Sequence, residues 1–360
     1  MKYFLISILT SVFLLFSCGE SQKRNEVKKE KVPYFSISFT KNPAIFSLHD
    51  TIEFTLNLVN KEIFKGVASF YIDDEIMDET FGNENTYSVY TNKISEVGDH
   101  ILKVELPYTD TVYTSTITFR FLSNVAPKQK SFIVKKTYPH DVNAYTQGLE
   151  FFNNQLFEGI GLNGKSEIRS VELETGKVLK SKAIDQQYFG EGITILNNKL
   201  IQLTWQSNIG FVYDLKTFEK LSSFNYATEG WGLCNNGVNL IMSDGSNKLY
   251  FLDTANFSVV KTLQVYDNYD KVDLLNELEW VDGYIYANVY TKNNIVKIDS
   301  KSGIVVEKID LKGILPEKSK TEQTDVLNGI AFNKKTGKMY ITGKNWPSLF
   351  EVTFVESVLP

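Results

Sequence analysis

From about residue 131 onward, the chain repeats one pattern of short apolar runs, and this repeat constrains the fold more than any other feature of the sequence. Each segment has an apolar run, a turn with Asn, Asp, Gly or Lys, a second apolar run, and further strand-like runs. Five such segments open at Gly148, Gly192, Gly232, Glu277 and Gly329. A period of roughly 40 to 50 residues with about four strands is the signature of propeller blades. Since a solenoid or a sandwich fits four strands per unit less well, the sequence predicts a five-bladed β-propeller over residues 131–356.

The two ends of this repeat region complement each other. The fifth segment ends with a strand at 349–354 and leaves no room for a fourth strand of its own. A lone strand-like run at 132–137 precedes the first segment. Pairing of these two runs would complete the fifth unit and hide the sheet edge that an open ring would leave unpaired.

Residues 33–125 show a different pattern, in which apolar and polar residues alternate over short runs such as 52–58 and 115–121. Period-two alternation predicts strands with one face in water. About seven short strands in this length suggest a separately folding β-sandwich of the immunoglobulin-like kind, with 124–130 as the linker. His49 and His100 lack carboxylate or Cys neighbours at ligand spacing, so no chemical site is expected here. The predicted fold class is therefore all-β: an immunoglobulin-like β-sandwich followed by a five-bladed β-propeller.

The first 32 residues have the features of an export signal and a tether. A short cationic start precedes an apolar run at 4–16, which is short for a membrane span. The run ends in Leu-Phe-Ser-Cys at 15–18, which resembles the lipobox of bacterial lipoproteins; an ordinary signal peptide with an incidental Cys is the alternative. The resemblance implies a signal over 1–18, lipid on Cys18, a polar tether over 19–32, and an exported protein of the cell envelope, with the outer membrane as the expected membrane. Cys234 would then have no disulfide partner.

Charge argues against a nucleic-acid partner, because a net charge of −5 gives no basic surface. The expected form of the protein is a monomer.

Polar and aromatic residues interrupt the repeat at equivalent points near the first strand of each segment. Equivalent points of a propeller converge at one end of the central channel, so these residues would share one apolar pocket with a few aimed polar groups. Taken singly, each is more commonly structural. The stretches are 145–148, 189–192, 229–232, 275–277 and 327–329, joined by Trp205, Tyr290 and 343–346.

Residues of about 138 to 352 resemble the plant-type glutaminyl cyclases, also called glutaminyl-peptide cyclotransferases, which are five-bladed propellers. The matching stretches are YTQGL (145–149), YFGEG (188–192), GWGL (230–233), LNELE (275–279), DVLNGIA (325–331) and TGK (342–344). The resemblance implies that Glu191 is the catalytic acid/base and that the substrate-binding residues are Tyr145, Gln147, Phe189, Trp205, Trp231, Asn276, Tyr290 and Lys344. Tyr145 stands where many members have Phe, and Tyr290 where plant members have Trp, which puts substrate preference rather than the reaction in question. The resemblance does not cover the first 130 residues.

The implied reaction suits these residue types. The α-amine of an N-terminal Gln attacks its own γ-carboxamide, closes a lactam and expels ammonia, so the expected partners are peptides or proteins that begin with Gln. Because the reaction is intramolecular, a shaped aromatic pocket supplies much of the help by orientation. One carboxyl with a raised pKa can take the amine proton and return it to the departing nitrogen. Lys344 or Asn276 could hold the developing oxyanion.

Two other functions remain open from the residues alone. A non-catalytic surface lipoprotein could bind peptides or glycans through the same fold, because propellers host many functions. A metal-dependent hydrolase, such as a lactonase, would need channel ligands; His140 is the only histidine after residue 130, although carboxylate and amide ligands for Ca²⁺ stay possible. The expectation is a reaction that needs no metal and no cofactor.

Overall fold

The computed structural model describes residues 34–59, 63–82 and 84–357, so the predicted signal, Cys18 and the tether lie outside the described residues. Over these ranges the protein is all-β, with 28 strands and one short 3₁₀ helix, η1 (Glu317–Ser319). The described part of the chain has no helix with the length and apolar character needed to cross a membrane.

Residues 34–122 form two sheets that share one hydrophobic core. Alternation in the sequence sets their faces: in β3, Ile52, Phe54 and Leu56 are buried while the residues between them face outward. Phe54 of one sheet meets Phe70 of the other edge to face, with ring centroids 5.2 Å apart. The first sheet contains β1 (Phe35–Phe39), β3 (Thr51–Leu58) and β6 (Thr86–Tyr90). The second contains, in spatial order, β2 (Ile45–Ser47), β8 (Thr111–Leu122), β7 (Gly98–Tyr108), β4 (Val67–Ile72) and β5 (Glu75–Phe81).

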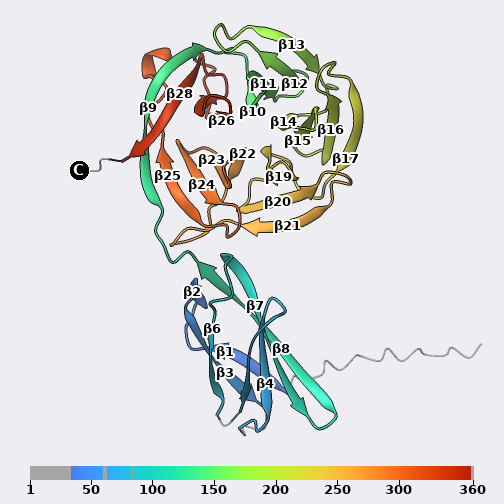
Figure 1. Ribbon diagram of the computed structural model, residues 1–360, viewed down its shortest axis with the longest axis vertical. Coiled ribbons are helices and arrows are strands. Elements are labelled where there is room, and N and C mark those ends of the chain that lie inside the picture. The colour runs from blue at the N-terminus through green and yellow to red at the C-terminus, as the bar shows by residue number, and fades with distance from the viewer. Residues whose placement is uncertain (1–33, 60–62, 83, 358–360) are drawn as a thin grey trace, which may run out of the picture.

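Three antiparallel sheets of four strands follow in chain order, one for each of the first three repeats. Figure 1 shows them set around a common centre, with the first strand of each sheet innermost and the fourth at the rim. The first is β10 (Thr146–Phe152), β11 (Gln155–Ile160), β12 (Glu167–Val171) and β13 (Val178–Ala183). The second is β14 (Gly190–Leu196), β15 (Lys199–Thr204), β16 (Ile209–Asp214) and β17 (Lys220–Asn225). The third is β18 (Leu233–Asn235), β19 (Asn239–Ser243), β20 (Lys248–Asp253) and β21 (Val259–Gln264).

An eight-stranded sheet completes the ring. The strand predicted at 132–137 is β9, and it pairs antiparallel with β28, which places the first ring strand beside the last. A second pairing was not foreseen: β9 also runs parallel to β25 through Lys128–Lys130 and so joins the fourth and fifth repeats into one sheet. These residues were expected to be linker, so the linker is shorter than predicted. The spatial order is β22 (Leu275–Val281), β23 (Tyr284–Val289), β24 (Asn294–Asp299), β25 (Val305–Asp310), β9 (Lys128–Pro139), β28 (Ser348–Glu356), β27 (Lys338–Gly343) and β26 (Leu327–Asn333).

The glycines that open the repeats let the inner strands approach one another. A Cβ at Gly192 would lie 2.5 Å from the backbone nitrogen of Leu233, and one at Gly232 would overlap the carbonyl oxygen of Asn276. At the other end of the inner strands, Asn153 and Asn154 have positive φ, as the tight turn of a two-residue hairpin requires. The repeat pattern in the sequence thus corresponds to one inner hairpin per repeat.

Buried carboxylates tie the inner strands together across the centre. Glu277 of β22 accepts the backbone N–H of Leu149 (3.1 Å) with one oxygen and that of Ile330 (2.8 Å) with the other. Glu279 accepts the N–H of Phe332 at 3.2 Å. These bonds join β22 to β10 and β26, two inner strands with which it has no strand pairing.

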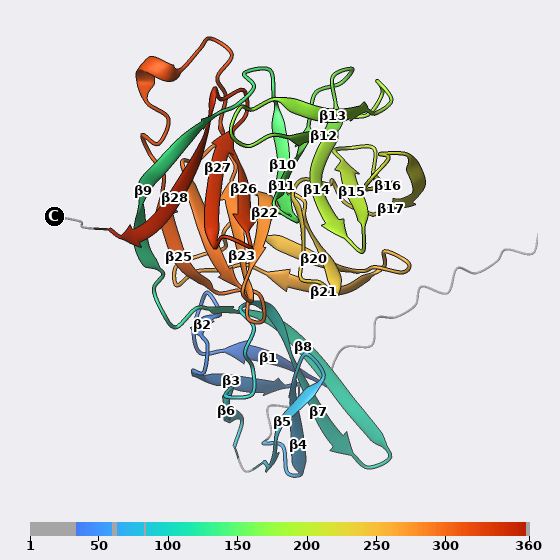
Figure 2. The same ribbon diagram turned by 45° about the horizontal axis from the view of Figure 1, so that its top comes forward.

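The N-terminal unit docks on the outside of the ring (Figure 2). Tyr266, in the loop after β21, is 1% exposed and belongs to the hydrophobic core of the N-terminal unit. Gln264 and Asp99 exchange two hydrogen bonds of 3.2 Å, and Lys261 pairs with Glu96 at 2.9 Å. The two units therefore share core and polar contacts rather than being joined by a linker alone.

Candidate active site

A cavity of about 200 Å³ lies where the inner strands begin. Its polar residues Gln147, Glu191 and Asn276 lie near the start of β10, β14 and β22, while Trp205, Tyr290 and Lys344 directly follow β15, β23 and β27. Each first strand and its antiparallel second strand thus deliver side chains to the same end of the ring. The nine lining residues are those singled out from the sequence: Tyr145, Gln147, Phe189, Glu191, Trp205, Trp231, Asn276, Tyr290 and Lys344.

Glu191 is the carboxylate of this cavity. It is 4% exposed, and its Oε1 accepts a hydrogen bond of 2.9 Å from the side-chain nitrogen of Gln147. Burial raises the pKa of Glu191 well above its usual value; the Lys344 ammonium acts in the opposite direction and the nearby Glu229 carboxylate adds to the rise. A buried carboxyl with a raised pKa that faces a cavity is suited to proton transfer.

Lys344 supplies the cation of the cavity and is 3% exposed. Burial lowers its pKa, although the Glu191 and Asp325 carboxylates favour the charged form. The Lys344 ammonium lies over two aromatic faces, 4.7 Å from the ring centroid of Tyr145 and 5.1 Å from that of Tyr290. The two positions that depart from the family pattern therefore both face the same ammonium group.

Aromatic rings form the walls in two groups. Tyr145 meets Phe189 edge to face at 6.1 Å, and Phe189 meets Trp205 in the same manner at 5.6 Å. On the other side Trp231 meets Tyr290 edge to face at 5.5 Å. Edge-to-face contacts fix ring orientation, so the walls have a defined shape before any ligand enters.

Asn276 leaves a polar atom available at the cavity. Its Oδ1 is buried and has no hydrogen-bond partner among the described residues. A buried acceptor without a donor costs free energy, which a ligand with an N–H group would recover. Asn276, Glu191 and Lys344 thus bring an amide acceptor, a buried carboxyl and a basic side chain into one largely apolar cavity.

The glutamine cyclotransferase family model matches residues 109–354 of the chain. The chain belongs to the glutamine cyclotransferase family. It is 40% identical to the glutaminyl-peptide cyclotransferase of Arabidopsis thaliana over 222 residues, which cover 60% of this chain and 68% of that protein. It also resembles the crystal structure of Myxococcus xanthus glutaminyl cyclase, with a TM-score of 0.60 and 34% identity, covering 63% of this chain and 98% of the other.

Two residues that hydrogen-bond to residues of the cavity, Asn328 and Glu229, were not assigned a role from the sequence. Asn328 donates to the side-chain oxygen of Gln147 at 3.3 Å and to the backbone oxygen of Thr146 at 2.9 Å, and so orients the amide that contacts Glu191. Glu229 accepts hydrogen bonds from both tryptophans of the cavity. Both lie in stretches recognised as pocket-forming, but nothing in the sequence specifies which way an amide or a partly exposed carboxylate points.

A buried ionic network lies beneath Gln147. Glu158 accepts two hydrogen bonds from Arg169 (2.9 and 2.7 Å), one from the Thr146 hydroxyl (2.6 Å), and lies 3.0 Å from His140. Burial opposes its charge, yet Arg169 and His140 together lower the pKa of Glu158. His140 also donates to the backbone oxygen of Trp346, so the network joins the strand that carries Gln147 to the segment that carries Lys344. His140, the only histidine after residue 130, is thus held between the Glu158 carboxylate and the backbone oxygen of Trp346.

Within the part of the chain that the structure describes, no group of three or more His, Cys, Asp and Glu side chains is arranged to hold a metal ion. Cys234 is buried as a free thiol.

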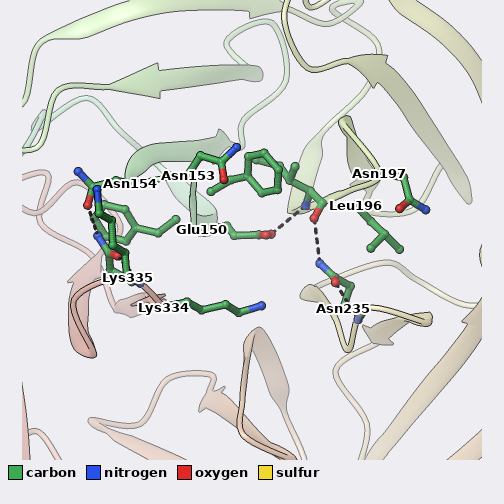
Figure 3. A pocket seen from close by; sticks show the side chains of 13 residues that line it. Glu150, Asn153, Asn154, Leu196, Asn197, Asn235, Lys334 and Lys335 are labelled. Carbon is green, nitrogen blue, oxygen red and sulfur yellow. Dashed lines mark hydrogen bonds between the residues drawn. The ribbon is translucent and has the colours of Figure 1, made fainter.

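A second, larger cavity of about 580 Å³ lies where the inner strands end. Figure 3 shows Glu150 of β10 and Lys334 of the turn after β26 pointing into it, with the turn residues Asn153 and Asn197 at its edge. The Glu150 carboxylate accepts the backbone N–H of Ile195 at 2.9 Å. No residue proposed for the active site lines this cavity, which is polar where the aromatic cavity is apolar.

Proposed function

We propose that the protein is a glutaminyl-peptide cyclotransferase, which converts an N-terminal Gln of peptides or proteins to pyroglutamate and releases ammonia. Family membership supports the activity. The observation that carries the proposal is the buried Glu191 in an aromatic cavity that also holds a cation and an unpartnered amide oxygen. These groups match the needs of a reaction that begins with an amine and a carboxamide.

The proposed first step is nucleophilic attack within the substrate. The neutral α-amine adds to the γ-carbonyl carbon, a C–N bond forms, and the carbonyl oxygen gains negative charge. An α-amino group has an unperturbed pKa near 8, so a strong base is not needed to prepare it. Glu191 accepts the proton that the amine nitrogen loses on forming the bond.

The second step is expulsion of ammonia. The protonated Glu191 returns its proton to the former amide nitrogen, the bond between carbon and that nitrogen breaks, and the lactam carbonyl re-forms. In this proposal the Lys344 ammonium stabilises the charge on oxygen between the two steps. The Asn276 Oδ1 accepts an N–H of the substrate, and the aromatic walls hold its methylene groups.

We infer a five-bladed propeller in which β22–β25 form the fourth blade and β26–β28 with β9 form the fifth. Support comes from the three separate four-stranded sheets and from the pairing of β9 with β28. The two sheets of residues 34–122, with their single core, support the immunoglobulin-like sandwich.

We further propose that the protein is an exported lipoprotein attached to the bacterial envelope through lipid on Cys18. Support comes from the sequence alone, namely the apolar run and the Leu-Phe-Ser-Cys ending at 15–18. Labelling with a radioactive or alkynyl fatty acid in cells, with Cys18→Ser as the control, tests this separately from the chemistry.

The activity is tested with residues 19–360 and synthetic peptides that begin with Gln. The expected result is a loss of one ammonia per peptide by mass spectrometry. An N-acetylated form of the same peptide should not react, because its nitrogen is no longer a nucleophilic amine. Binding of the Gln peptide without loss of ammonia would instead support the non-catalytic peptide-binding alternative.

A further inference from the structure

Glu229 connects the two tryptophans of the cavity. It lies in the loop between β17 and β18, and its Oε2 accepts the indole N–H of Trp205 at 2.7 Å and that of Trp231 at 2.9 Å. Its Oε1 accepts the side-chain amide of Gln206 at 3.0 Å. One carboxylate thus receives three side-chain donors from two segments of the chain.

The contact joins the two aromatic groups into one wall. Trp205 belongs to the group that contains Phe189, and Trp231 to the group that contains Tyr290. Trp205 is 37% exposed, so its packing leaves one side of the ring to solvent. An indole N–H is a donor only, and a charged acceptor holds it in a narrow range of orientations. Without Glu229, the orientation of each indole ring would be set only by the aromatic residues of its own group.

The loop backbone holds this carboxylate in place. The N–H of Gly230 donates to the backbone oxygen of Trp205 at 3.1 Å, and the N–H of Trp231 donates to Ser243 at 3.0 Å. The Thr228 hydroxyl donates to the backbone oxygen of Glu229 at 3.0 Å. Glu229 is therefore presented from a fixed backbone to both rings, as a positioning group requires.

We propose that Glu229 is a positioning residue that fixes both indole rings against the substrate cavity. The proposal rests on the proposed cyclotransferase function, because it assigns the rings to substrate binding. Glu229 does not contact the reacting atoms; it acts by orienting Trp205 and Trp231.

The charge of Glu229 has a second effect on the same site. Burial would raise its pKa, but the hydrogen bonds from Trp231, Gln206 and Trp205 lower it, so the carboxylate is ionised at neutral pH. That negative charge adds to the raised pKa of Glu191, whereas Lys344 acts in the opposite direction. The titratable groups that interact with Glu191 also include Tyr145 and Tyr226, which stay neutral because burial raises the pKa of both hydroxyls.

The first test compares kcat/KM of Glu229→Ala, Glu229→Gln and Glu229→Asp in the full chain. The matched control is Glu219→Gln, which removes an exposed carboxylate from the turn before β17 and leaves the same net charge as Glu229→Gln. Glu229→Ala should lower kcat/KM by about 10- to 100-fold, the expected effect of losing hydrogen bonds to a charged acceptor, mainly through a higher KM. Glu229→Asp should recover part of the loss. An unchanged kcat/KM in Glu229→Ala would overturn the proposal.

The second test is a double-mutant cycle that separates action through the rings from a general effect on folding. Trp205→Phe with Trp231→Phe keeps aromatic rings but removes both indole N–H groups. In that background Glu229→Ala should cost about twofold or less at the pH plateau, because coupled residues are not additive. An equal loss in both backgrounds would show that Glu229 does not act through the indoles.

Two further readouts distinguish failure of this proposal from failure of the proposed function. Glu229→Ala should increase acrylamide quenching of tryptophan fluorescence, while Glu219→Gln should not, and this measurement needs no activity. Unchanged quenching would overturn the role of Glu229 even in an active enzyme. If the wild-type protein cyclises no peptide but Glu229→Ala still increases quenching, the proposed function alone is overturned.

In an active enzyme, Glu229→Gln should also move the acidic limb of the pH profile of kcat to lower pH. Loss of the neighbouring negative charge lowers the pKa of Glu191 and so favours its ionised form.

Discussion

Glu191→Gln is the substitution that tests the proposed chemistry most directly. Glu191 makes one side-chain hydrogen bond, in which its Oε1 accepts from Gln147 at 2.9 Å. A glutamine side chain has nearly the same shape and keeps an acceptor oxygen for that bond. What it removes is the proton that Glu191 would carry from the attacking amine to the departing nitrogen.

The expected loss in turnover is about 10²- to 10⁴-fold, the range for removing a general acid/base. KM should change little, because the aromatic walls and Asn276 remain. Orientation of the substrate is retained, so turnover should stay above the uncatalysed rate.

The stability of the same variant has a predictable sign. Burial raises the folded-state pKa of Glu191, and this outweighs the attraction of Lys344. The stability that a carboxyl with a raised folded-state pKa contributes is fully present below its unfolded-state pKa. It is lost as the pH rises through the folded-state pKa, and the loss is about 1.4 kcal/mol for each unit by which the two pKa values differ. Glu191→Gln cannot ionise and escapes this loss. The variant should therefore match the wild type near pH 4 and melt at an equal or higher temperature at pH 8.

Both quantities are measured on one preparation, with turnover followed by ammonia release and unfolding by calorimetry at the two pH values. A structural carboxylate would give the reverse pattern, in which the melting temperature falls at both pH values and turnover is normal. Turnover close to that of the wild type in the folded variant would refute the assignment of Glu191 as the acid/base.

Four further outcomes are expected. Lys344→Met keeps an apolar side chain but removes the ammonium group. If Lys344 stabilises the oxyanion, kcat measured by ammonia release should fall by about 10²-fold. Glu279→Gln should flatten the decline of melting temperature between pH 5 and pH 9, because burial and the nearby Glu150 and Glu277 raise the pKa of Glu279. Tyr266→Ala should lower the free energy of unfolding by about 3 kcal/mol, as for other large aromatic truncations in a core, with turnover within a few-fold of wild type by the same assay. Incubation with a chelator should leave turnover unchanged, and activity that zinc alone restores would contradict this.

Much of the ring could be predicted because its inner hairpins repeat a local signal. Turn residues with positive φ, such as Asn153 and Asn197, and glycines at close approaches, such as Gly192, recur at fixed places in each repeat. Once five equivalent positions are aligned, their convergence follows from the geometry of a ring. This is why side chains as distant in sequence as Tyr145 and Lys344 could be assigned to one cavity.

The parts that were missed depend on contacts that leave no periodic signal. The parallel pairing of β9 with β25 rests on three residues at 128–130, whose composition is that of a linker. Nothing in the sequence around Tyr266 distinguishes it from the other aromatic residues after residue 130. Only the structure shows that it packs in the hydrophobic core of the N-terminal unit. Glu229 lies in the predicted pocket-forming stretch 229–232, but nothing in the sequence shows that its carboxylate accepts both indole N–H groups. Each of these contacts is fixed by tertiary packing rather than by local propensity.

A raised pKa does not by itself distinguish the proposed catalytic carboxylate from the structural ones. Burial raises the pKa of Glu277 as it does that of Glu191, and both lie near the start of an inner strand. They differ in what their oxygens contact. Both oxygens of Glu277 accept backbone N–H groups of neighbouring strands, so protonation or movement there would break contacts that join the sheets. Glu191 has a single side-chain donor and lines a cavity, so it can exchange a proton with a bound molecule while the backbone around it stays in place. The free lone pairs and the open face of Glu191, rather than its pKa alone, make it the residue suited to proton transfer.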